Sequence, residues 1–214
     1  MIGKGVFWII GLVALAAVAA SCTMQQKTQQ AQPQAQTQTQ QQAVATMPAD
    51  LQPAVRDAEL WGRALYDSYT APQAASDKAV ERAITTVRQS VKDHCAGTYR
   101  AVAVMPPGAP RDRIVIYDIG EAPASQGIML GRHYRVETTP DGKGVLLGEP
   151  STTGCVVLPP ASAAGPTTIT HDLSPAPNEY HVFLSLLYGR SFEVVTEAGR
   201  WLVEHGTIRY IGRS

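Results

Sequence analysis

Residues 25–42 constrain most strongly what this chain can fold into, because they contain no apolar side chain larger than alanine. The stretch is almost entirely glutamine, threonine and alanine, with Pro33 inside it. It cannot bury enough apolar surface to offset the entropy of ordering its backbone. We therefore expect residues 22–47 to form a flexible tether, with an average span of roughly 25 Å over its glutamine-rich part. A glutamine-rich interaction or aggregation tract is the alternative for this composition.

The segment before the tether has the pattern of a secretory signal peptide. Lys4 is followed by an apolar run over residues 6–20, and small residues stand directly before Cys22. The run is too short for a transmembrane helix, which needs about 20 apolar residues. The pattern resembles the signal of bacterial lipoproteins, in which the cysteine thiol is acylated and the cysteine becomes the new N-terminus. That resemblance implies a signal peptide over residues 1–21 and lipidation of Cys22; a non-lipidated signal with a coincidental cysteine is the alternative.

The residue after Cys22 bears on where such a lipoprotein would be sorted. In the Gram-negative proteins that this signal resembles, aspartate at that position favours retention in the inner membrane. Here the residue is Thr23. The resemblance thus implies an outer-membrane protein that faces the periplasm and contacts the membrane through its N-terminal lipid.

The charge balance argues against nucleic acid as a partner. The chain carries 18 basic and 18 acidic residues and has no basic block. Nucleic-acid binding requires a concentrated positive surface. Residues 48–214 are long enough for one domain with a hydrophobic core, and we expect them to form a single periplasmic domain.

Two cysteines lie inside this predicted domain, Cys95 and Cys155. In an oxidising compartment such a pair favours a disulfide. Two buried thiols that never meet are the alternative. His94 directly precedes Cys95, but neighbours in sequence rarely form a catalytic dyad, because activation of a thiol depends on spatial geometry.

Helical spacing dominates the first part of the domain. Apolar residues recur at intervals of three and four over residues 51–69 and again over residues 80–91. Pro72 is placed to end the first helix. Ser76 is placed to cap the second helix, and Gly97 is placed to end it.

After Gly97 the pattern changes to short β-rich segments separated by turn residues. The predicted strands cover residues 99–104, 113–119, 128–138 with an interruption allowed at Gly131, 145–147, 155–158, 167–170, 192–196, 201–204 and 207–211. A further helix is predicted over residues 179–188, with Ser174 or Asn178 as its cap and Gly189 just past its end. The sequence therefore predicts an α+β fold, with two N-terminal helices followed by a mostly antiparallel sheet and one further helix near residues 178–188.

Residues 171–181 contain the chain's most distinctive set of potential metal ligands. They follow a predicted strand, open a predicted helix and precede two further strands. This order resembles the JAB/MPN metallopeptidases, in which an H-x-H pair and an S-x-x-D step hold a catalytic zinc. The resemblance implies zinc ligation by His171, His181 and Asp172, because a catalytic zinc needs three protein ligands and one open position.

The chain departs from the JAB/MPN pattern at two positions. Ile169 stands where the first histidine of the pair would be, and His181 stands where the aspartate would be. Glu137 is the nearest upstream strand carboxylate that could activate water. The alternative is structural: a loop and cap after His171, and a surface position for His181.

The remaining polar residues carry little catalytic signal. No G-x-S-x-G elbow, Walker A motif or G-x-G-x-x-G fingerprint is present. Asp118 and Glu121 are expected to form a solvated pair at a strand end, and His133 is expected to be exposed on a strand.

The sequence thus favours a lipid-anchored, non-enzymatic binding module without a cofactor. Its expected partner is an envelope protein, peptidoglycan or a toxin-like ligand. A zinc-dependent hydrolase related to the JAB/MPN proteins, with a rearranged or inactive site, is the alternative.

Overall fold

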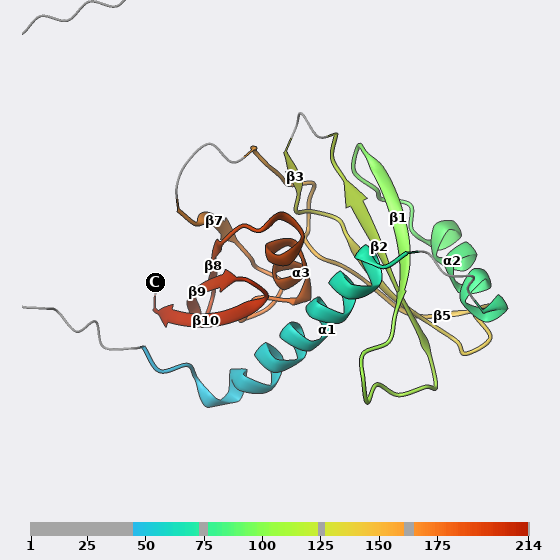
Figure 1. The fold of residues 1–214 in the computed structure, drawn as a ribbon, viewed down its shortest axis with the longest axis horizontal. Helices are drawn as coiled ribbons and strands as arrows, with labels where there is room; N and C mark the ends of the chain where they lie inside the picture. Colours follow the sequence, from blue (N-terminus) through green and yellow to red (C-terminus); the bar gives the residue numbers. More distant parts are fainter. Residues whose placement is uncertain (1–44, 73–76, 124–126, 161–164, 214) are drawn as a thin grey trace, which may run out of the picture. The chain divides into compact units, whose positions relative to one another are not determined.

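The computed structural model describes residues 45–72, 77–123, 127–160 and 165–213, which belong to one compact unit spanning residues 42–214. Its helices are the 3-10 turn η1 (Ala49–Leu51), α1 (Gln52–Thr70), α2 (Lys78–Ser90) and α3 (Glu179–Tyr188). Its strands are β1 (Thr98–Val104), β2 (Ile114–Glu121), β3 (Ile128–Met129), β4 (Tyr134–Thr138), β5 (Val145–Pro150), β6 (Val157–Leu158), β7 (Thr167–Thr170), β8 (Phe192–Thr196), β9 (Gly199–Glu204) and β10 (Thr207–Gly212). The predicted α+β fold with a largely antiparallel arrangement of strands is confirmed (Figure 1).

Some predicted features lie outside the described residues. They are the signal peptide, Cys22, most of the tether and the predicted cap Ser76. Within the described part of the chain, no helix combines the length and the apolar character that crossing a bilayer requires.

Helix α2 shows both a confirmed pattern and a corrected boundary. Its apolar stripe is buried through Ala83 and Val87, and the side chain of Asp77 caps it by accepting a hydrogen bond from the Ala79 amide at 2.9 Å. The helix ends at Ser90, well before the predicted end at Gly97. The reason is local, because Val91 already has extended backbone angles and a β-branched residue favours that conformation.

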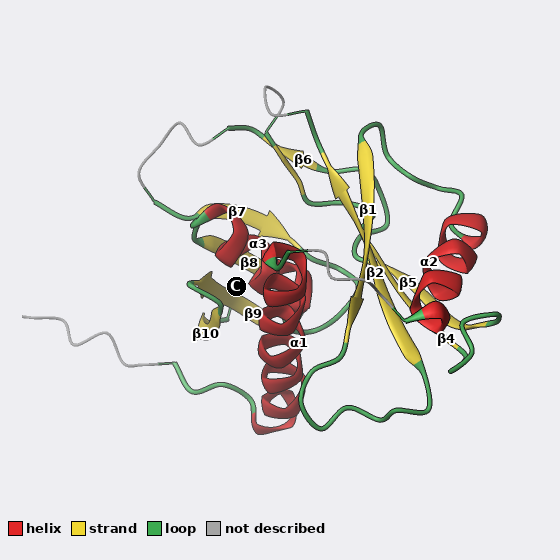
Figure 2. Ribbon diagram, turned by 45° about the vertical axis from the view of Figure 1, so that its right-hand side comes forward, coloured by secondary structure: helices red, strands yellow, loops and turns green. Residues whose placement is uncertain are grey.

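Sheet A contains four antiparallel strands in the order β1-β2-β4-β5. Alternation of side chains gives it two apolar faces. One face contributes Ala101 and Ile116 to a core under α2, and the other contributes Val102 and Tyr117 to the main core. Figure 2 shows α2 on one side of this sheet and α1 with α3 on the other.

Sheet C has the order β10-β9-β8-β7. Its pairs are antiparallel except for β7 and β8, which run parallel. Parallel neighbours need a crossover connection, and α3 supplies it between these two strands. Phe192, Trp201 and Val203 are fully buried between this sheet and the helices.

Helices α1 and α3 pack directly against each other, and Figure 1 shows α1 running beside α3. Gly62 allows this approach. A Cβ atom added at Gly62 would lie 2.5 Å from the Val182 Cβ and 2.7 Å from the Glu179 carbonyl oxygen. Glycine at this position lowers the helix propensity of α1, but it allows the close crossing that holds α3 in the core.

Candidate functional site

A cavity of about 580 Å³ lies where the C-terminal ends of α1 and α3 approach the end of β2 and the start of β3. Its lining consists of Tyr69, Glu121, Ala122, Gly127, Ile128, Pro160, Leu187, Tyr188 and Arg190. The volume is within the roughly 300–1,000 Å³ typical of small-molecule sites. The wall is mostly apolar and aromatic with one carboxylate and one guanidinium, which is the usual composition of a binding pocket.

Tyr69 connects this wall to the core. Its hydroxyl donates to a carboxylate oxygen of Glu121, and its ring packs edge-on against Phe183. The guanidinium carbon of Arg100 lies 4.4 Å from the Tyr69 ring centroid, a cation–π geometry. Burial, and then the hydrogen bond to Glu121, raise the pKa of Tyr69 far above its ordinary value. Tyr69 is therefore a neutral donor that fixes the position of Glu121.

The end of α3 supplies another part of the wall. The helix stops at Tyr188 because Gly189 adopts left-handed backbone angles, with φ 59°. This turn brings Arg190 to the cavity, where it donates to the Pro159 carbonyl at 3.2 Å and to the Thr167 hydroxyl at 2.6 Å. Tyr188 is 40% exposed and can contact a ligand directly.

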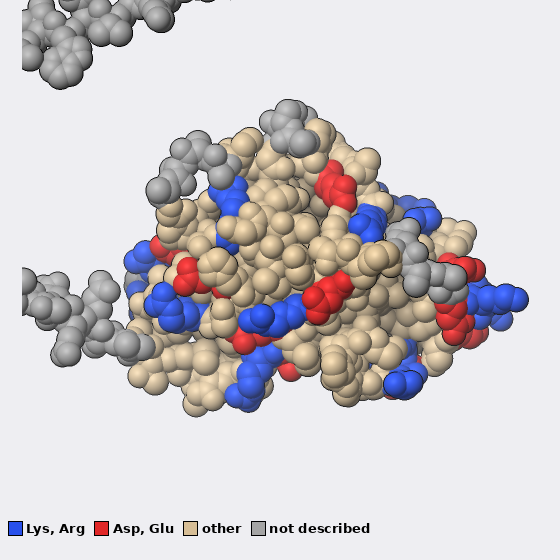
Figure 3. Space-filling view, in the orientation of Figure 1, with Lys and Arg blue, Asp and Glu red and all other residues tan. Residues whose placement is uncertain are grey.

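The side chains around the cavity are better suited to holding a ligand than to catalysing a reaction. A ligand with an apolar body could place a donor on Glu121 and an acceptor on Arg190. None of the described residues that line the cavity is a serine, cysteine or histidine, the side chains that most often form a nucleophile–base pair. Figure 3 shows an uncharged expanse over α3, with acidic and basic side chains interspersed around it.

The predicted metal ligands lie in a different region. The rings of His171 and His181 are adjacent, with centroids 4.9 Å apart and nearly perpendicular planes. His171 Nε2 is 2.8 Å from the Ser174 hydroxyl, and His181 Nδ1 accepts from the Asn178 amide at 3.2 Å. His181 is only 2% exposed, so the alternative of a surface position for it is wrong. In the capping box of α3, the side chains of Asn178 and His181 each accept a hydrogen bond from the other residue's backbone. These bonds hold the His181 ring in the interior.

Among the described residues, His171 and His181 have no third potential metal ligand beside them. Asp172 is exposed, and among the described residues no group of three or more His, Cys, Asp and Glu side chains is placed to share a metal ion. The residues present thus do not match the three protein ligands of a catalytic zinc, and we assign no zinc chemistry to them.

Cys95 and Cys155 are joined by a disulfide, with their Cα atoms 5.7 Å apart. Cys95 lies between α2 and β1, and Cys155 lies in the loop between β5 and β6. The bond therefore ties the segment after α2 to the loop between β5 and β6.

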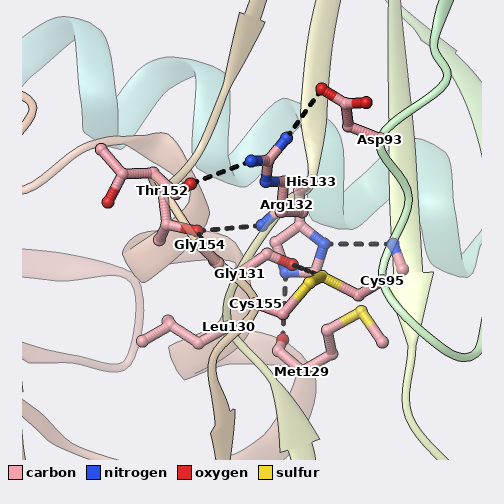
Figure 4. The surroundings of a disulfide bond; sticks show 12 residues. Asp93, Cys95, Met129, Leu130, Gly131, Arg132, His133, Thr152, Gly154 and Cys155 are labelled. Carbon is pink, nitrogen blue, oxygen red and sulfur yellow. Dashed lines mark hydrogen bonds and ion pairs between the residues drawn. A yellow bond between two sulfur atoms is a disulfide. The ribbon is translucent and has the colours of Figure 1, made fainter.

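Arg132 reinforces the same junction (Figure 4). Its guanidinium donates to the Asp93 carboxylate at 3.2 Å and to the Thr153 carbonyl at 3.0 Å. These partners stand two residues before the two cysteines, so one side chain bridges both cysteine-bearing segments. Its backbone adopts φ 58°, which is uncommon for a residue with a side chain.

Two expectations about polar residues are wrong. His133 is fully buried: its Nδ1 accepts from the Gly120 amide at 3.1 Å, and its Nε2 lies 3.0 Å from the Met129 carbonyl. Asp118 is 2% exposed and lies 2.7 Å from His94 Nε2. Their burial could not be predicted locally, because Gly120 and His94, which bond His133 and Asp118, are distant in sequence.

The buried histidines predict acid sensitivity. Burial lowers the pKa of His133 to about 4 and that of His181 to about 3, the latter also through His171. Below pH 6.5 the unfolded chain therefore binds protons that the native protein does not, so the free energy of unfolding falls as pH falls. His133 alone should cost about 2 kcal/mol between pH 6.5 and pH 5. Urea unfolding across that range measures the slope.

The matched variant for this prediction is His133→Gln. It lowers stability at neutral pH, because it disturbs the bonds to Gly120 and Met129, but it should make the slope between pH 6.5 and pH 5 shallower. An unchanged slope would show that His133 titrates normally in the folded protein.

No protein-family model, curated protein or solved structure matches this chain. The assignment of a function therefore depends on the chain's own residues.

The cavity could not be predicted from the sequence. Tyr69 was assigned to a helix stripe, Glu121 was expected in solvent, and Arg190 carried no pattern at all. The only local signal was Gly189 after a predicted helix, which indicates a turn but not what the next residue faces.

Proposed function

We propose that this protein is a lipid-anchored binding module of the outer membrane, which faces the periplasm and holds a ligand or partner in the cavity between the ends of α1 and α3. The cavity is the observation that carries the proposal. It combines about 580 Å³ of space with an apolar and aromatic wall and two opposite charges.

The composition of the wall narrows the choice of partner. Leu187 and Ile128 offer apolar contact, Tyr69 and Tyr188 offer aromatic rings, and each charge can hold one polar group. Glycan strands are rich in hydroxyl groups and would need many hydrogen-bonding side chains. Side chains of an envelope protein, or the peptide part of peptidoglycan, suit this wall better.

The N-terminal sequence supports the anchored half of the proposal. Cys22 follows a signal-like segment, and the glutamine-rich stretch after it is suited to hold a domain away from the lipid surface. The disulfide between Cys95 and Cys155 suits an oxidising compartment.

Photo-cross-linking from the cavity wall tests the proposal. A benzophenone amino acid replaces Tyr188 in the full-length protein in intact cells, and we expect a discrete cross-linked product in the membrane fraction. The control places the same group at Leu60, which is 42% exposed and does not line the cavity. The proposal predicts a product from position 188 and none from position 60, and it predicts that Cys22→Ala moves the protein out of the membrane fraction.

Equal products from both positions would indicate non-specific contact and contradict the cavity assignment. Retention of the Cys22→Ala protein in membranes would contradict the lipid anchor. The two halves of the proposal can therefore fail independently.

A further inference from the structure

Strand β5 is a terminal strand of sheet A, at the opposite end of the strand order from β1. It pairs with β4 on one side, and no strand in the described part of the chain pairs with its other side. Every residue of β5 is exposed. The free edge of β5 therefore presents backbone N–H and C=O groups to which another strand could bind.

The side chains along this edge are apolar. Val145, Leu146 and Leu147 are consecutive in the chain and are 45%, 55% and 41% exposed. A bulge leaves Leu146 without a partner on β4. Bulges and charges commonly shield an edge strand from other strands, but here the bulged residue is itself apolar and exposed, so it does not shield the edge. An exposed apolar edge of this kind is a site of strand pairing.

Opposite charges stand at the two ends of the apolar run. Lys143 precedes it and Glu149 follows it, in the order Lys-Gly-Val-Leu-Leu-Gly-Glu. The Lys143 ammonium lies 3.7 Å from the carboxylate of Asp141, and both side chains are largely exposed, so this ion pair is weak. Glu149 has no ion-pair partner among the described residues. Both charges can therefore pair with groups on another chain.

The order of these residues is complementary to itself when two copies run in opposite directions. With Leu146 opposite Leu146, each Val145 lies opposite Leu147, and each Lys143 lies opposite Glu149. A parallel pairing would place Lys143 beside Lys143, and an antiparallel register shifted by two residues would place an apolar side chain opposite a charge. The apolar contacts and the charges thus favour the same register, which has a two-fold axis at Leu146.

We propose that two copies of this protein associate by antiparallel pairing of their β5 strands, with Leu146 at the two-fold axis. The chain's own residues 25–42 are a poor occupant of this edge, because they contain no apolar side chain larger than alanine. The inference goes beyond the proposed function and uses a different surface, since none of the residues that line the cavity belongs to β5. Dimer formation and a product cross-linked from Tyr188 can therefore be found or lost separately.

A cysteine at the two-fold axis tests the pairing. The full-length protein with Leu146→Cys is purified in detergent and mildly oxidised. Opposite residues of antiparallel strands have Cα atoms about 4.5–5.5 Å apart, a distance that a disulfide spans. We therefore expect a cross-linked dimer on a non-reducing gel. Because a pair of six-residue strands is a small interface, the yield of dimer should rise with protein concentration.

Two controls accompany this experiment. The protein without the new cysteine reports any product that its other cysteines form. Leu60→Cys places a thiol on α1, at a residue that is 42% exposed and distant in sequence from β5. Neither control should give the dimer.

Charge reversal tests the register. Lys143→Glu or Glu149→Lys, each added to the Leu146→Cys protein, places like charges at both ends of the strand pair and should weaken association about tenfold. The two reversals together restore opposite charges at each end, so the combined variant should recover the yield of dimer. Arg56→Glu, which reverses an exposed charge on α1, should leave the yield unchanged.

Three results would overturn the inference: no dimer from Leu146→Cys, an equal yield of dimer from Leu60→Cys, or no recovery when both charges are reversed. Oxidation of intact cells in which Leu146→Cys links to a different protein and not to itself would also overturn it, because the β5 edge would then bind a partner and not a second copy.

Discussion

Replacement of both Cys95 and Cys155 by alanine is expected to lower the free energy of unfolding by about 4 kcal/mol. The two residues are separated by 60 positions, and a cross-link across a loop of that length removes much of the entropy of the unfolded chain. Domains of this kind are stable by only about 5–15 kcal/mol, so the loss is a large share of the total. Urea unfolding of the two proteins, with the stability difference taken from the midpoints, measures it.

Arg132 provides the internal comparison for this prediction. It bridges the same two segments through Asp93 and Thr153, so Arg132→Ala should cost less than loss of the disulfide in the oxidised protein. A loss below about 1 kcal/mol in the double alanine variant would mean that the unfolded chain is already restrained, and that the covalent bond contributes little.

Gly62→Ala is expected to destabilise the domain by about 2–3 kcal/mol. Helix propensity alone predicts the opposite, a gain of about 1 kcal/mol. The sign reverses because the new Cβ would lie 2.5 Å from the Val182 Cβ and 2.7 Å from the Glu179 carbonyl oxygen. Since neither neighbour is the end of a flexible side chain, α1 and α3 must separate to admit the methyl group. Thermal or urea unfolding measures the change.

Gly148 is the matched control for Gly62. It lies on the exposed strand β5, and a Cβ added there would meet no atom within 4 Å. Gly148→Ala should therefore change stability by no more than about 0.5 kcal/mol. A stabilising effect of Gly62→Ala would show that the α1–α3 crossing is wider than the structure gives.

Elements with a clear local pattern could be predicted from the sequence. The helix over residues 179–188 was predicted with its observed bounds, and the cap Asn178 and the terminal Gly189 were among the residues expected at its ends. The strands over 167–170 and 192–196 were also predicted with the bounds observed. The helix could be predicted from the capping residues at its ends, and the strand over 192–196 shows alternating burial; both signals depend on residues a few positions apart.

The polar interior could not be predicted, because each of its side chains depends on a distant partner. Asp118 is buried against His94, and Glu121 accepts from Tyr69, 52 positions away in sequence. His133 sits where an irregular turn at Arg132 directs it inward. Nothing within a few residues of these positions distinguishes them from solvated side chains.

The same reason explains why the cavity was not predicted. Tyr69, Glu121 and the pair Tyr188 and Arg190 come from three separate segments, and the packing of α1 against α3 helps to bring them together. That packing depends on Gly62. In the sequence alone, this glycine indicates only a lowered helix propensity.

The most direct test of the binding assignment is the cross-link from position 188, repeated in a protein whose cavity has been filled. Ala122 lines the cavity, and Ala122→Trp would occupy much of its space. We predict that the product formed from position 188 disappears in the filled protein, while its folding and membrane attachment persist. The same product in equal yield from the filled protein would contradict the claim that this cavity holds the partner.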